Sequence, residues 1–337
     1  MKTSVIDIGL QWETPALTLA LSEAMAQGAA AQVVVNTTGS SGIKKRVVLS
    51  IDAISASAEL SNARINAMSG DVWSLLLPTN HIAGLNVLAR ALKLGSSVVG
   101  ADQRADYTAI VPTQLHRALF GDSKLLEHLQ NCKSVLVGGS PASKVLLDAA
   151  VKAGISVITT YGMTETSGGC VYDKKALPGV SVMVDESGRL KIKGPILASG
   201  YENNQNLWAQ NFKDGWFITS DLGEVKDDEI KIIGRMDDVI ITGGENVSLF
   251  AIENELAAGF PGTSFLATAI PDAEWGQKIC LISTSEIDND QIAELLKTTL
   301  GKQFVPKEFL VMPQIPEIGI GKPDRVKASQ IFIDKQR

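Results

Sequence analysis

The chain contains 337 residues, of which 45% are hydrophobic and 20% are charged, and its formal net charge at pH 7 is -6. A chain of this length and composition can bury a sizeable core, which excludes global disorder and leaves room for one large domain or two. No long run of acidic or basic residues occurs, so we expect neither a nucleic acid nor an anionic membrane as a partner.

The cysteine content and the N-terminus both argue against export. Cys132, Cys170 and Cys280 fit neither a disulfide framework nor a metal-ligand pair, because they are few and well separated. The N-terminus lacks a basic segment followed by an apolar core, and no stretch approaches the ~18 apolar residues that span a bilayer. We therefore expect a cytoplasmic protein that is not inserted in a membrane.

Strand patterns alternate with helical patterns in the first half of the chain. Short apolar runs bounded by turn residues predict strands buried in a sheet. A helix with an apolar stripe comes first, and a later helix has Ser140 as its cap, Pro141 at its first position and Gly154 at its end. This alternation predicts an α/β fold with a mostly parallel, covered sheet. The strands are 32–35, 72–77, 134–137 and 156–159, and the helical apolar faces are Ile82, Leu85, Leu88 and Leu92, then Val145, Leu146 and Ala149.

The second half of the chain has shorter and more polar strands. After about Gly179, runs such as 189–193 and 229–233 are separated by turn residues, which predicts a small antiparallel subdomain.

A new helix begins after Val247. Ser248 is its predicted cap, and its apolar face is formed by Leu249, Ile252 and Leu256. The chain beyond it reads as a compact α+β unit. We therefore place a domain boundary at Asp237, between an N-terminal domain over residues 1–236 and a small C-terminal domain over residues 237–337.

A polar loop follows the predicted strand 32–35. It reads Thr37-Thr38-Gly39-Ser40-Ser41-Gly42-Ile43-Lys44-Lys45. Such a loop presents backbone N–H groups, hydroxyls and a cation to a polyphosphate. It is not a Walker A motif, because the second glycine of that motif would fall on Lys44. Taken alone, the segment is also compatible with an ordinary surface loop.

The segment Tyr161-Gly162-Met163-Thr164-Glu165-Thr166 comes directly after a predicted buried strand. Open α/β sheets bind their ligands at this end of their strands. A flat ring, a small hydroxyl donor and a hard carboxylate oxygen suit a nucleotide and its cation. Without further context it would be a polar turn, and Gly138-Gly139-Ser140 would be a turn from a strand to a helix.

Three further segments complete a known order of motifs: 216–223, with Asp221; 234–245, with Arg235, Asp237, Gly243 and Gly244; and 319–322, which ends in Lys322. With the earlier motifs they resemble the signature of the adenylate-forming (AMP-binding) acyl-CoA ligases. The resemblance implies a large N-terminal α/β domain with an antiparallel subdomain and a mobile C-terminal α+β domain. It also implies that ATP activates a carboxylate as an acyl-adenylate, which coenzyme A then captures.

The resemblance assigns roles to individual residues. Thr164 contacts the α-phosphate, Glu165 coordinates Mg²⁺, and Lys322 is the catalytic cation between the two anionic reactants. Asp237 is the hinge. The remaining contacts to ATP or CoA fall on Thr37, Thr38, Gly39, Ser40, Ser41, Gly42, Lys45, Gly138, Gly139, Ser140, Tyr161, Gly162, Met163, Asp221, Arg235, Gly243 and Gly244. Without the family motifs, Asp221, Arg235 and Lys322 would be interpreted as surface charges. Gly243-Gly244 would be interpreted as a tight turn.

The acyl substrate is assigned to a second set of residues. His81 borders the acyl pocket and the thiol channel, with Ser167 and Gly168 nearby. Arg90 is our candidate for the substrate's second carboxylate. The alternative for His81 is a structural role. The alternative for Arg90 is a solvated position on a helix.

The compact chain most resembles the short actinobacterial-type o-succinylbenzoate–CoA ligases of menaquinone biosynthesis. Four segments carry this resemblance: 80–85, 111–115, 161–173 and 274–277. It implies o-succinylbenzoate, ATP, Mg²⁺ and CoA as reactants and cofactors. Another aryl- or acyl-CoA ligase, a ligase that loads a carrier protein, and a non-catalytic nucleotide-binding relic remain alternatives. The sequence leaves the oligomeric state open, with a homodimer as one option.

Overall fold

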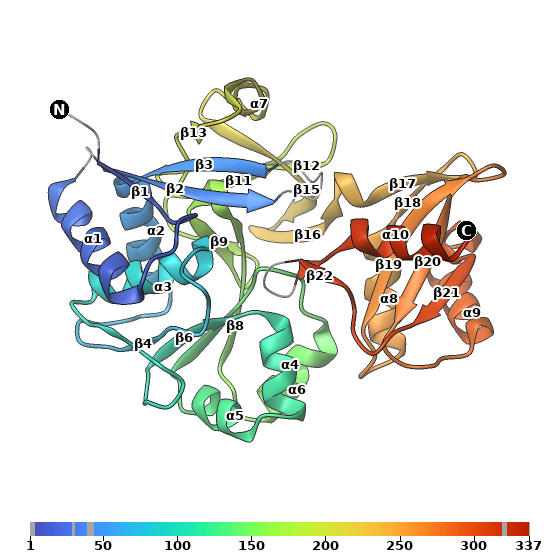
Figure 1. The fold of residues 1–337 in the computed structure, drawn as a ribbon, viewed down its shortest axis with the longest axis horizontal. Coiled ribbons are helices and arrows are strands. Elements are labelled where there is room, and N and C mark those ends of the chain that lie inside the picture. The colour runs from blue at the N-terminus through green and yellow to red at the C-terminus, as the bar shows by residue number, and fades with distance from the viewer. Residues whose placement is uncertain (1–3, 29–30, 39–43, 319–321, 337) are drawn as a thin grey trace. The chain divides into compact units, whose positions relative to one another are not determined.

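The computed structural model describes residues 4–28, 31–38, 44–318 and 322–336. The chain divides into two compact units (Figure 1). The predicted boundary at Asp237 lies within the second unit, so the hinge there stays a prediction. The first unit is Met1–Ala142, Leu146–Thr219 and Glu224–Lys231, and the second is Ser143–Val145, Ser220–Gly223 and Ile232–Arg337.

A seven-stranded mixed sheet forms the centre of the first unit. Its order is β10-β9-β8-β7-β6-β4-β5, and the five strands from β8 to β5 are parallel to one another. This arrangement confirms the predicted α/β fold with a mostly parallel sheet. The strands are β4 (Trp73–Ser74), β5 (Val98–Val99), β6 (Tyr107–Ile110), β7 (Ser134–Val137), β8 (Val157–Met163), β9 (Gly168–Tyr172) and β10 (Lys175–Ala176).

The predicted strands agree with this sheet to different degrees. The run 134–137 is β7, whereas the run 72–77 supplies only the two residues of β4. The run 156–159 was predicted to end before Tyr161, which is wrong because β8 continues to Met163. It continues because β9 pairs with it antiparallel, with Tyr161 opposite Val171. This second ladder keeps the backbone extended, and the residues of β8 are half-buried.

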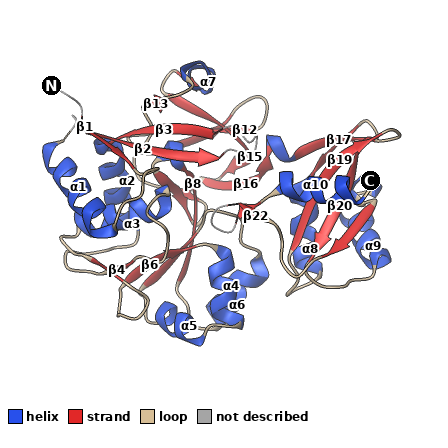
Figure 2. Cartoon of the chain, in the orientation of Figure 1, coloured by secondary structure: helices blue, strands red, loops and turns tan. Residues whose placement is uncertain are grey.

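A second sheet of the first unit has the order β1-β2-β3-β13. β2 and β3 form an antiparallel hairpin, and Thr37 lies within β2 opposite Lys45 of β3. Helices α1, α2 and α3 pack with this sheet around one apolar cluster (Figure 2). The elements are β1 (Ser4–Asp7), β2 (Ala31–Thr38), β3 (Lys44–Ser50), β13 (Gly200–Tyr201), α1 (Thr14–Gln27), α2 (Ile51–Arg64) and α3 (Ile82–Lys93).

Helix α3 has the predicted apolar stripe, with Leu85 and Leu88 fully buried. The predicted start of the later helix is wrong. This helix, α6 (Lys144–Lys152), begins four residues after Ser140, the predicted cap. Ala142 packs against the apolar cluster of β7 and its neighbouring helices. The helix therefore begins only after Ala142. Val145 is 38% exposed instead of lying on the buried face. The neighbouring helices are α4 (Pro112–Phe120) and α5 (Ser123–Gln130).

The predicted antiparallel strands form a five-stranded sheet. Its order is β11-β12-β15-β14, with β16 beside β15. The run 189–193 is β12, and the run 229–233 extends to Arg235 as β16. The remaining elements are β11 (Ser181–Val184), β14 (Phe212–Lys213), β15 (Trp216–Lys226) and α7 (Gln205–Asn211), with β12 (Arg189–Lys193) and β16 (Glu229–Arg235).

The second unit is built on the three-stranded sheet β19-β20-β21. Side chains on β20 alternate between two apolar clusters: Ile279 and Leu281 pack with α8 and α9, whereas Cys280 and Ile282 pack with α10. Helices therefore cover both faces. The elements are β17 (Val239–Thr242), β18 (Glu245–Ser248), α8 (Leu249–Gly259), β19 (Phe265–Asp272), β20 (Gly276–Ser283), α9 (Asn289–Thr299), β21 (Glu308–Val311), β22 (Glu317–Ile318), β23 (Lys322–Pro323) and α10 (Arg325–Lys335).

Helix α8 confirms the predicted cap. The Ser248 side chain accepts a hydrogen bond from the backbone N–H of Ala251 at 3.2 Å. The predicted apolar face is the buried one, since Leu249, Ile252 and Leu256 are each at most 3% exposed. A capping residue and a helical stripe are local signals, which is why the sequence locates this helix.

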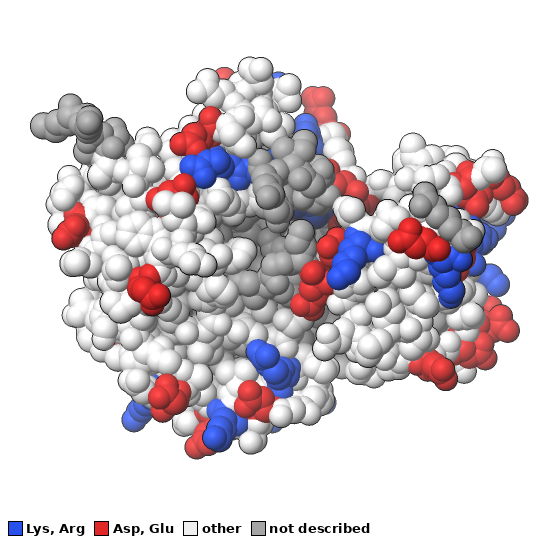
Figure 3. Space-filling view, in the orientation of Figure 1, with Lys and Arg blue, Asp and Glu red and all other residues white. Residues whose placement is uncertain are grey.

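Within the described residues, no helix has the length and apolar character needed to cross a bilayer. On the face shown in Figure 3, the described acidic and basic side chains of each unit are interspersed, with broad uncharged areas between them.

Candidate active site

The predicted metal ligand lies in a tight turn at the end of β8. Thr164, Glu165 and Thr166 form the short 3-10 helix η1. Thr166 closes the turn, because its hydroxyl accepts from the N–H of Met163 at 3.0 Å and donates to the carbonyl of Gly168 at 2.7 Å. Thr164 and Glu165 are each only 8% exposed. The fold therefore holds a carboxylate at the end of a central strand, where α/β sheets place their ligands.

Tyr201 contacts the predicted metal ligand, and the sequence analysis missed it. Its hydroxyl donates a hydrogen bond of 2.7 Å to the Oε1 atom of Glu165. Burial, followed by the neighbouring Glu165 carboxylate, raises the pKa of the Tyr201 phenol. No local motif marks this tyrosine, which lies 36 residues after Glu165 in the sequence.

The same tyrosine contacts the predicted phosphate loop. The Nζ atom of Lys45 lies 5.2 Å from the centroid of the Tyr201 ring, within cation–π range. The structure thus brings Lys45, Tyr201 and Glu165 together. Thr37 lies half-buried in β2. Gly39, Ser40, Ser41 and Gly42, and the side chain of Thr38, lie outside the described residues.

The predicted adenine-pocket segment lies beside β8. Gly138 follows β7 and donates its N–H to the carbonyl of Ile110 at 3.1 Å. A Cβ at Gly138 would overlap the hydroxyl of Thr160, the residue before Tyr161. This close approach places Gly138 next to the strand that carries Tyr161, Gly162 and Met163. Gly139 and Ser140 follow in an irregular segment, and Gly139 has a left-handed φ of 84°.

Two of the predicted acyl-site residues, Ser167 and Gly168, lie against the first half of α3. His81 precedes the first residue of this helix. Ser167 adopts a left-handed φ of 49°, and its carbonyl accepts hydrogen bonds from the side chains of Ser57 at 2.8 Å and Asn86 at 2.6 Å. Gly168 has a φ of 96°, and a Cβ there would overlap the Asn86 amide. Asn86 is a further residue that sequence reasoning missed.

Arg90 lies one turn beyond Asn86 and is only 4% exposed, so the alternative of a solvated helix arginine is wrong. Its Nη2 donates to the hydroxyl of Tyr172 at 3.2 Å, and its guanidinium lies 5.1 Å from the Trp73 ring centroid. Among the described residues it forms no ion pair with a carboxylate, and its Nε has no hydrogen-bond partner. Other buried polar atoms of the described residues share this property, among them Asn62 Oδ1, Trp73 Nε1, Asn86 Oδ1 and Ser167 Oγ.

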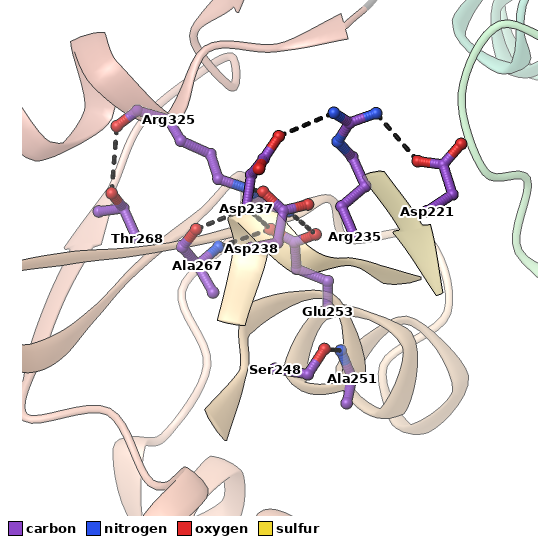
Figure 4. Close-up of polar contacts among 10 residues, drawn as sticks. All are labelled: Asp221, Arg235, Asp237, Asp238, Ser248, Ala251, Glu253, Ala267, Thr268 and Arg325. Atoms are coloured by element: carbon purple, nitrogen blue, oxygen red, sulfur yellow. Dashed lines mark hydrogen bonds and ion pairs between the residues drawn. The ribbon is translucent and has the colours of Figure 1, made fainter. Parts of the chain in front are cut away.

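The predicted ribose contacts pair in the second unit. Arg235 joins Asp221, at 2.9 Å, to Asp237, also at 2.9 Å (Figure 4). Burial alone would lower the pKa of Arg235, but Asp221 and Asp237 raise it above its usual value. Asp221 is 6% exposed, whereas the Asp237 side chain is 40% exposed. The predicted hinge residue Asp237 lies in the 3-10 helix η2 (Met236–Asp238).

Two further predicted segments lie in the second unit. Gly243 and Gly244 form the turn between β17 and β18, with left-handed φ angles of 57° and 83°. The N–H of Gly243 donates to the carbonyl of Trp275 at 2.9 Å. The backbone of Lys322 pairs with Ile318 across β22 and β23, while its side chain lies outside the described residues.

A metal ion fits the Glu165 carboxylate. Among the described residues, no group of three or more His, Cys, Asp or Glu side chains is arranged to hold a metal. Mg²⁺ does not need such a group, since it is usually bound by one or two carboxylates together with phosphates and water. Glu165 offers a hard oxygen ligand, and among the described residues its carboxylate has one hydrogen bond, at Oε1.

A cavity of about 420 Å³ also lies beside Tyr201. It is formed by residues of β2, β3 and α7 and of β13 with its flanking residues, and none of the predicted site residues lines it. Its lining is Gln32, Val48, Ser199, Gly200, Tyr201, Glu202, Gln205 and Trp208.

The chain is similar to known proteins over most of its length. The family model described as "AMP-binding enzyme" matches residues 13–202. A Mycobacterium tuberculosis protein described as "Probable 2-succinylbenzoate--CoA ligase" is 34% identical over 332 residues, covering 89% of this chain and 84% of that protein. The 2-succinylbenzoate–CoA ligase of Listeria monocytogenes is 26% identical and covers 87% of this chain and 68% of its own length.

Solved structures give the same fold. The crystal structure of ATP-bound MatB from Rhodopseudomonas palustris superposes with a TM-score of 0.80 at 26% identity, covering 92% of this chain and 69% of that one.

Proposed function

Because this chain belongs to the AMP-binding enzyme family, we propose that it is an ATP-dependent acid–thiol ligase that joins o-succinylbenzoate to coenzyme A in menaquinone biosynthesis. Two steps make up the reaction. A carboxylate oxygen attacks the α-phosphorus of ATP, and pyrophosphate leaves. The sulfur of CoA, having lost its proton, then attacks the acyl carbon, and AMP leaves. The relatives named for this substrate support the assignment.

In the first unit, three groups serve the nucleotide. The ring of Tyr161 stacks on the adenine, flanked by the Gly138-Gly139-Ser140 segment. Lys45 and the loop from Thr37 to Gly42 bind the phosphates, and Thr164 donates to the α-phosphate. The phosphate role of Lys45 is supported by its contact with the Tyr201 ring, because the hydroxyl of the same tyrosine donates to Glu165, the proposed metal ligand.

Mg²⁺ would be held by Glu165 and would neutralise phosphate charge. The burial of Glu165 and its single hydrogen bond support this role. In the second unit, Asp221 and Arg235 serve the ribose, Asp237 is the hinge, and Gly243 and Gly244 let the pantetheine approach the backbone.

Lys322 has the central catalytic role. It bridges the carboxylate and the α-phosphate while negative charge builds between two anionic reactants, which would otherwise repel one another. His81 lies at the thiol side of the acyl pocket, with Ser167 and Gly168 at the acyl group.

The burial of Arg90 is the observation that carries the substrate assignment. A guanidinium that is 4% exposed and has no carboxylate partner among the described residues is costly, and an anionic ligand would compensate it. o-Succinylbenzoate brings two carboxylates, one to react and one to be recognised. A fatty acid or benzoate brings only the reacting one.

The test compares substrates that differ in the second carboxylate. Pyrophosphate release and thioester formation with free CoA are measured with o-succinylbenzoate, benzoylpropionate, benzoate and a medium-chain fatty acid. We expect o-succinylbenzoate to react best and removal of its ring carboxylate to cost on the order of 2–4 kcal/mol in kcat/KM. If benzoate or the fatty acid reacted best, another acyl-CoA ligase would be the function. Absence of pyrophosphate release with every acid would favour a non-catalytic nucleotide-binding protein.

The proposal includes a cytoplasmic location. Cys132, Cys170 and Cys280 are all free thiols, which fits a reducing compartment.

A further inference from the structure

Tyr201 lies where two sheets of the first unit meet. In β13 it pairs antiparallel with Val47 of β3, two residues beyond Lys45. Its side chain is 2% exposed and belongs to the apolar cluster around β2 and β3. Glu165, in contrast, lies in η1, directly after β8 of the seven-stranded sheet. A single buried ring therefore spans the distance between a predicted phosphate-binding strand and a predicted metal ligand.

The segment 198–201 holds Glu165 at two points. The N–H of Ala198 donates to the Glu165 backbone carbonyl at 2.8 Å, and the Tyr201 hydroxyl donates to its Oε1 at 2.7 Å. Two anchors restrict both the backbone and the side-chain rotation of Glu165. Since the hydroxyl binds Oε1, it favours an orientation of the carboxylate in which Oε2 is open to a cation.

The ring of Tyr201 has a second neighbour. The Lys45 ammonium lies 5.2 Å from its centroid, and a cation at this distance is attracted to the negative face of the ring. Lysine side chains lose much rotamer freedom when they bind a phosphate. A ring that already restrains Lys45 reduces that loss. The hydroxyl and the face of one side chain thus act on two different charged groups.

We propose that Tyr201 is a positioning residue that orients the Glu165 carboxylate toward Mg²⁺ and restrains Lys45 for the phosphates of ATP. This inference rests on the proposed function, in which Glu165 binds the metal and Lys45 binds phosphate. A purely structural tyrosine is the competing explanation. Its ring also packs edge-to-face on Trp208, with centroids 5.3 Å apart, and this packing does not require the hydroxyl.

The decisive variant is Tyr201→Phe, which keeps the ring and removes the hydroxyl. Tyr107→Phe is its matched control, because Tyr107 is also 2% exposed and its hydroxyl also donates to a carboxylate, Asp71, at 3.3 Å. ATP affinity is measured by titration calorimetry with and without Mg²⁺, in the absence of any carboxylate substrate, so that no turnover occurs. Melting temperatures of both variants report on packing.

We expect Tyr201→Phe to weaken ATP binding in Mg²⁺ about 10-fold, the lower end of the range for removing a partner of a metal ligand. Binding without Mg²⁺ should change little, and Tyr107→Phe should bind ATP as the parent does under both conditions. An equal loss with and without Mg²⁺, or no loss at all, would overturn the proposal for Glu165.

Glu165→Gln separates this inference from the proposed function. If Glu165→Gln loses Mg²⁺-dependent affinity and Tyr201→Phe does not, only the role of Tyr201 fails. If Glu165→Gln shows no Mg²⁺-specific loss, the metal role of Glu165 itself fails.

The Lys45 part is tested by a double-mutant cycle. Tyr201→Leu removes the ring, and Lys45→Met removes the charge. We expect the two losses in Mg²⁺-free ATP affinity to be non-additive, because Lys45 without its ring contributes less. Additive losses would refute the restraint on Lys45. Should Tyr201→Leu fail to fold, Tyr201→Met also removes the ring and repeats the cycle. Tyr201→Phe, which keeps the ring, is the control, and its losses should be additive.

Discussion

Arg90 in the first unit and Arg325 in the second are both removed from solvent, but their surroundings differ completely. Arg325 contacts Asp238 at 3.0 Å, Glu253 at 2.9 Å and the carbonyl of Ala267 at 2.6 Å (Figure 4). Its side chain keeps 20% exposure. Arg90 is more deeply buried, yet a tyrosine hydroxyl and an aromatic face are its neighbours in place of carboxylates.

The difference indicates what each arginine does. A buried guanidinium whose charge and donors are matched holds elements together, and Arg325 joins the start of α10 to α8, β19 and η2. A buried guanidinium whose charge is unmatched is costly to fold unless a ligand compensates it. We therefore expect Arg325 to stabilise the second unit, while substrate recognition by Arg90 stays a proposal.

The largest effect on stability is expected at Arg325. Arg325→Met leaves Asp238 and Glu253 without their shared partner, and their side chains are only 12% and 14% exposed. We expect a loss of about 3 kcal/mol in the free energy of unfolding, the lower end of the range for breaking a buried pair. Chemical denaturation measures it. Arg189→Met, which breaks a more exposed ion pair with Asp185, is the control and should cost less than about 1 kcal/mol. Equal losses would remove the distinction between a structural arginine and a surface one.

Lys322 lies three residues before Arg325, but its replacement should affect catalysis and not stability. We expect Lys322→Ala to slow acyl-adenylate formation at least about 10²–10³-fold, as removal of a group that stabilises transition-state charge does. Thioester formation from preformed acyl-adenylate and the melting temperature should both be retained. Lys327→Ala, which changes an exposed lysine of α10, is the control. Comparable losses in both half-reactions would contradict the catalytic role.

Arg90→Met sharpens the other half of the comparison. Stability should change little or rise, because an unmatched buried charge is replaced by an apolar side chain. Selectivity should fall: the preference for o-succinylbenzoate over benzoylpropionate, measured as the ratio of kcat/KM values, should shrink about 10-fold or more. Arg117→Met changes the same charge at an exposed position and should leave that ratio unaltered. A variant that is clearly less stable but keeps its selectivity would make Arg90 structural.

The smallest effect concerns pH. Burial raises the pKa of Glu253, and Arg325 opposes that rise. Without Arg325 the pKa rises further, so the folded state of Arg325→Met favours the protonated acid. A group whose folded pKa lies above its unfolded value loses its stabilising contribution as pH increases through the folded pKa. The destabilisation by Arg325→Met should therefore shrink as pH is lowered from 7 toward 5. Adding Glu253→Gln should abolish this dependence, and a penalty that grows on acidification would contradict the assignment.

Local patterns account for the parts of this protein that the sequence predicted well. The cap and apolar face of α8, the stripe of α3 and strand β7 depend on neighbouring residues, so their signals lie within one element. The motif order likewise identified the family, because each motif keeps its own short spacing. The roles that this resemblance gives to individual residues, including the hinge at Asp237, remain predictions.

Only the tertiary structure decided which distant residues meet. The extension of β8 depends on β9, and the late start of α6 depends on a core that Ala142 joins from outside the helix. Tyr201 has no motif of its own. For Arg90 the sequence was equally compatible with a solvated helix face, because a sequence does not reveal which distant side chains cover that face. Burial and partner choice are properties of the assembled core. For a charged or phenolic side chain these two properties determine its energetic cost and therefore its role.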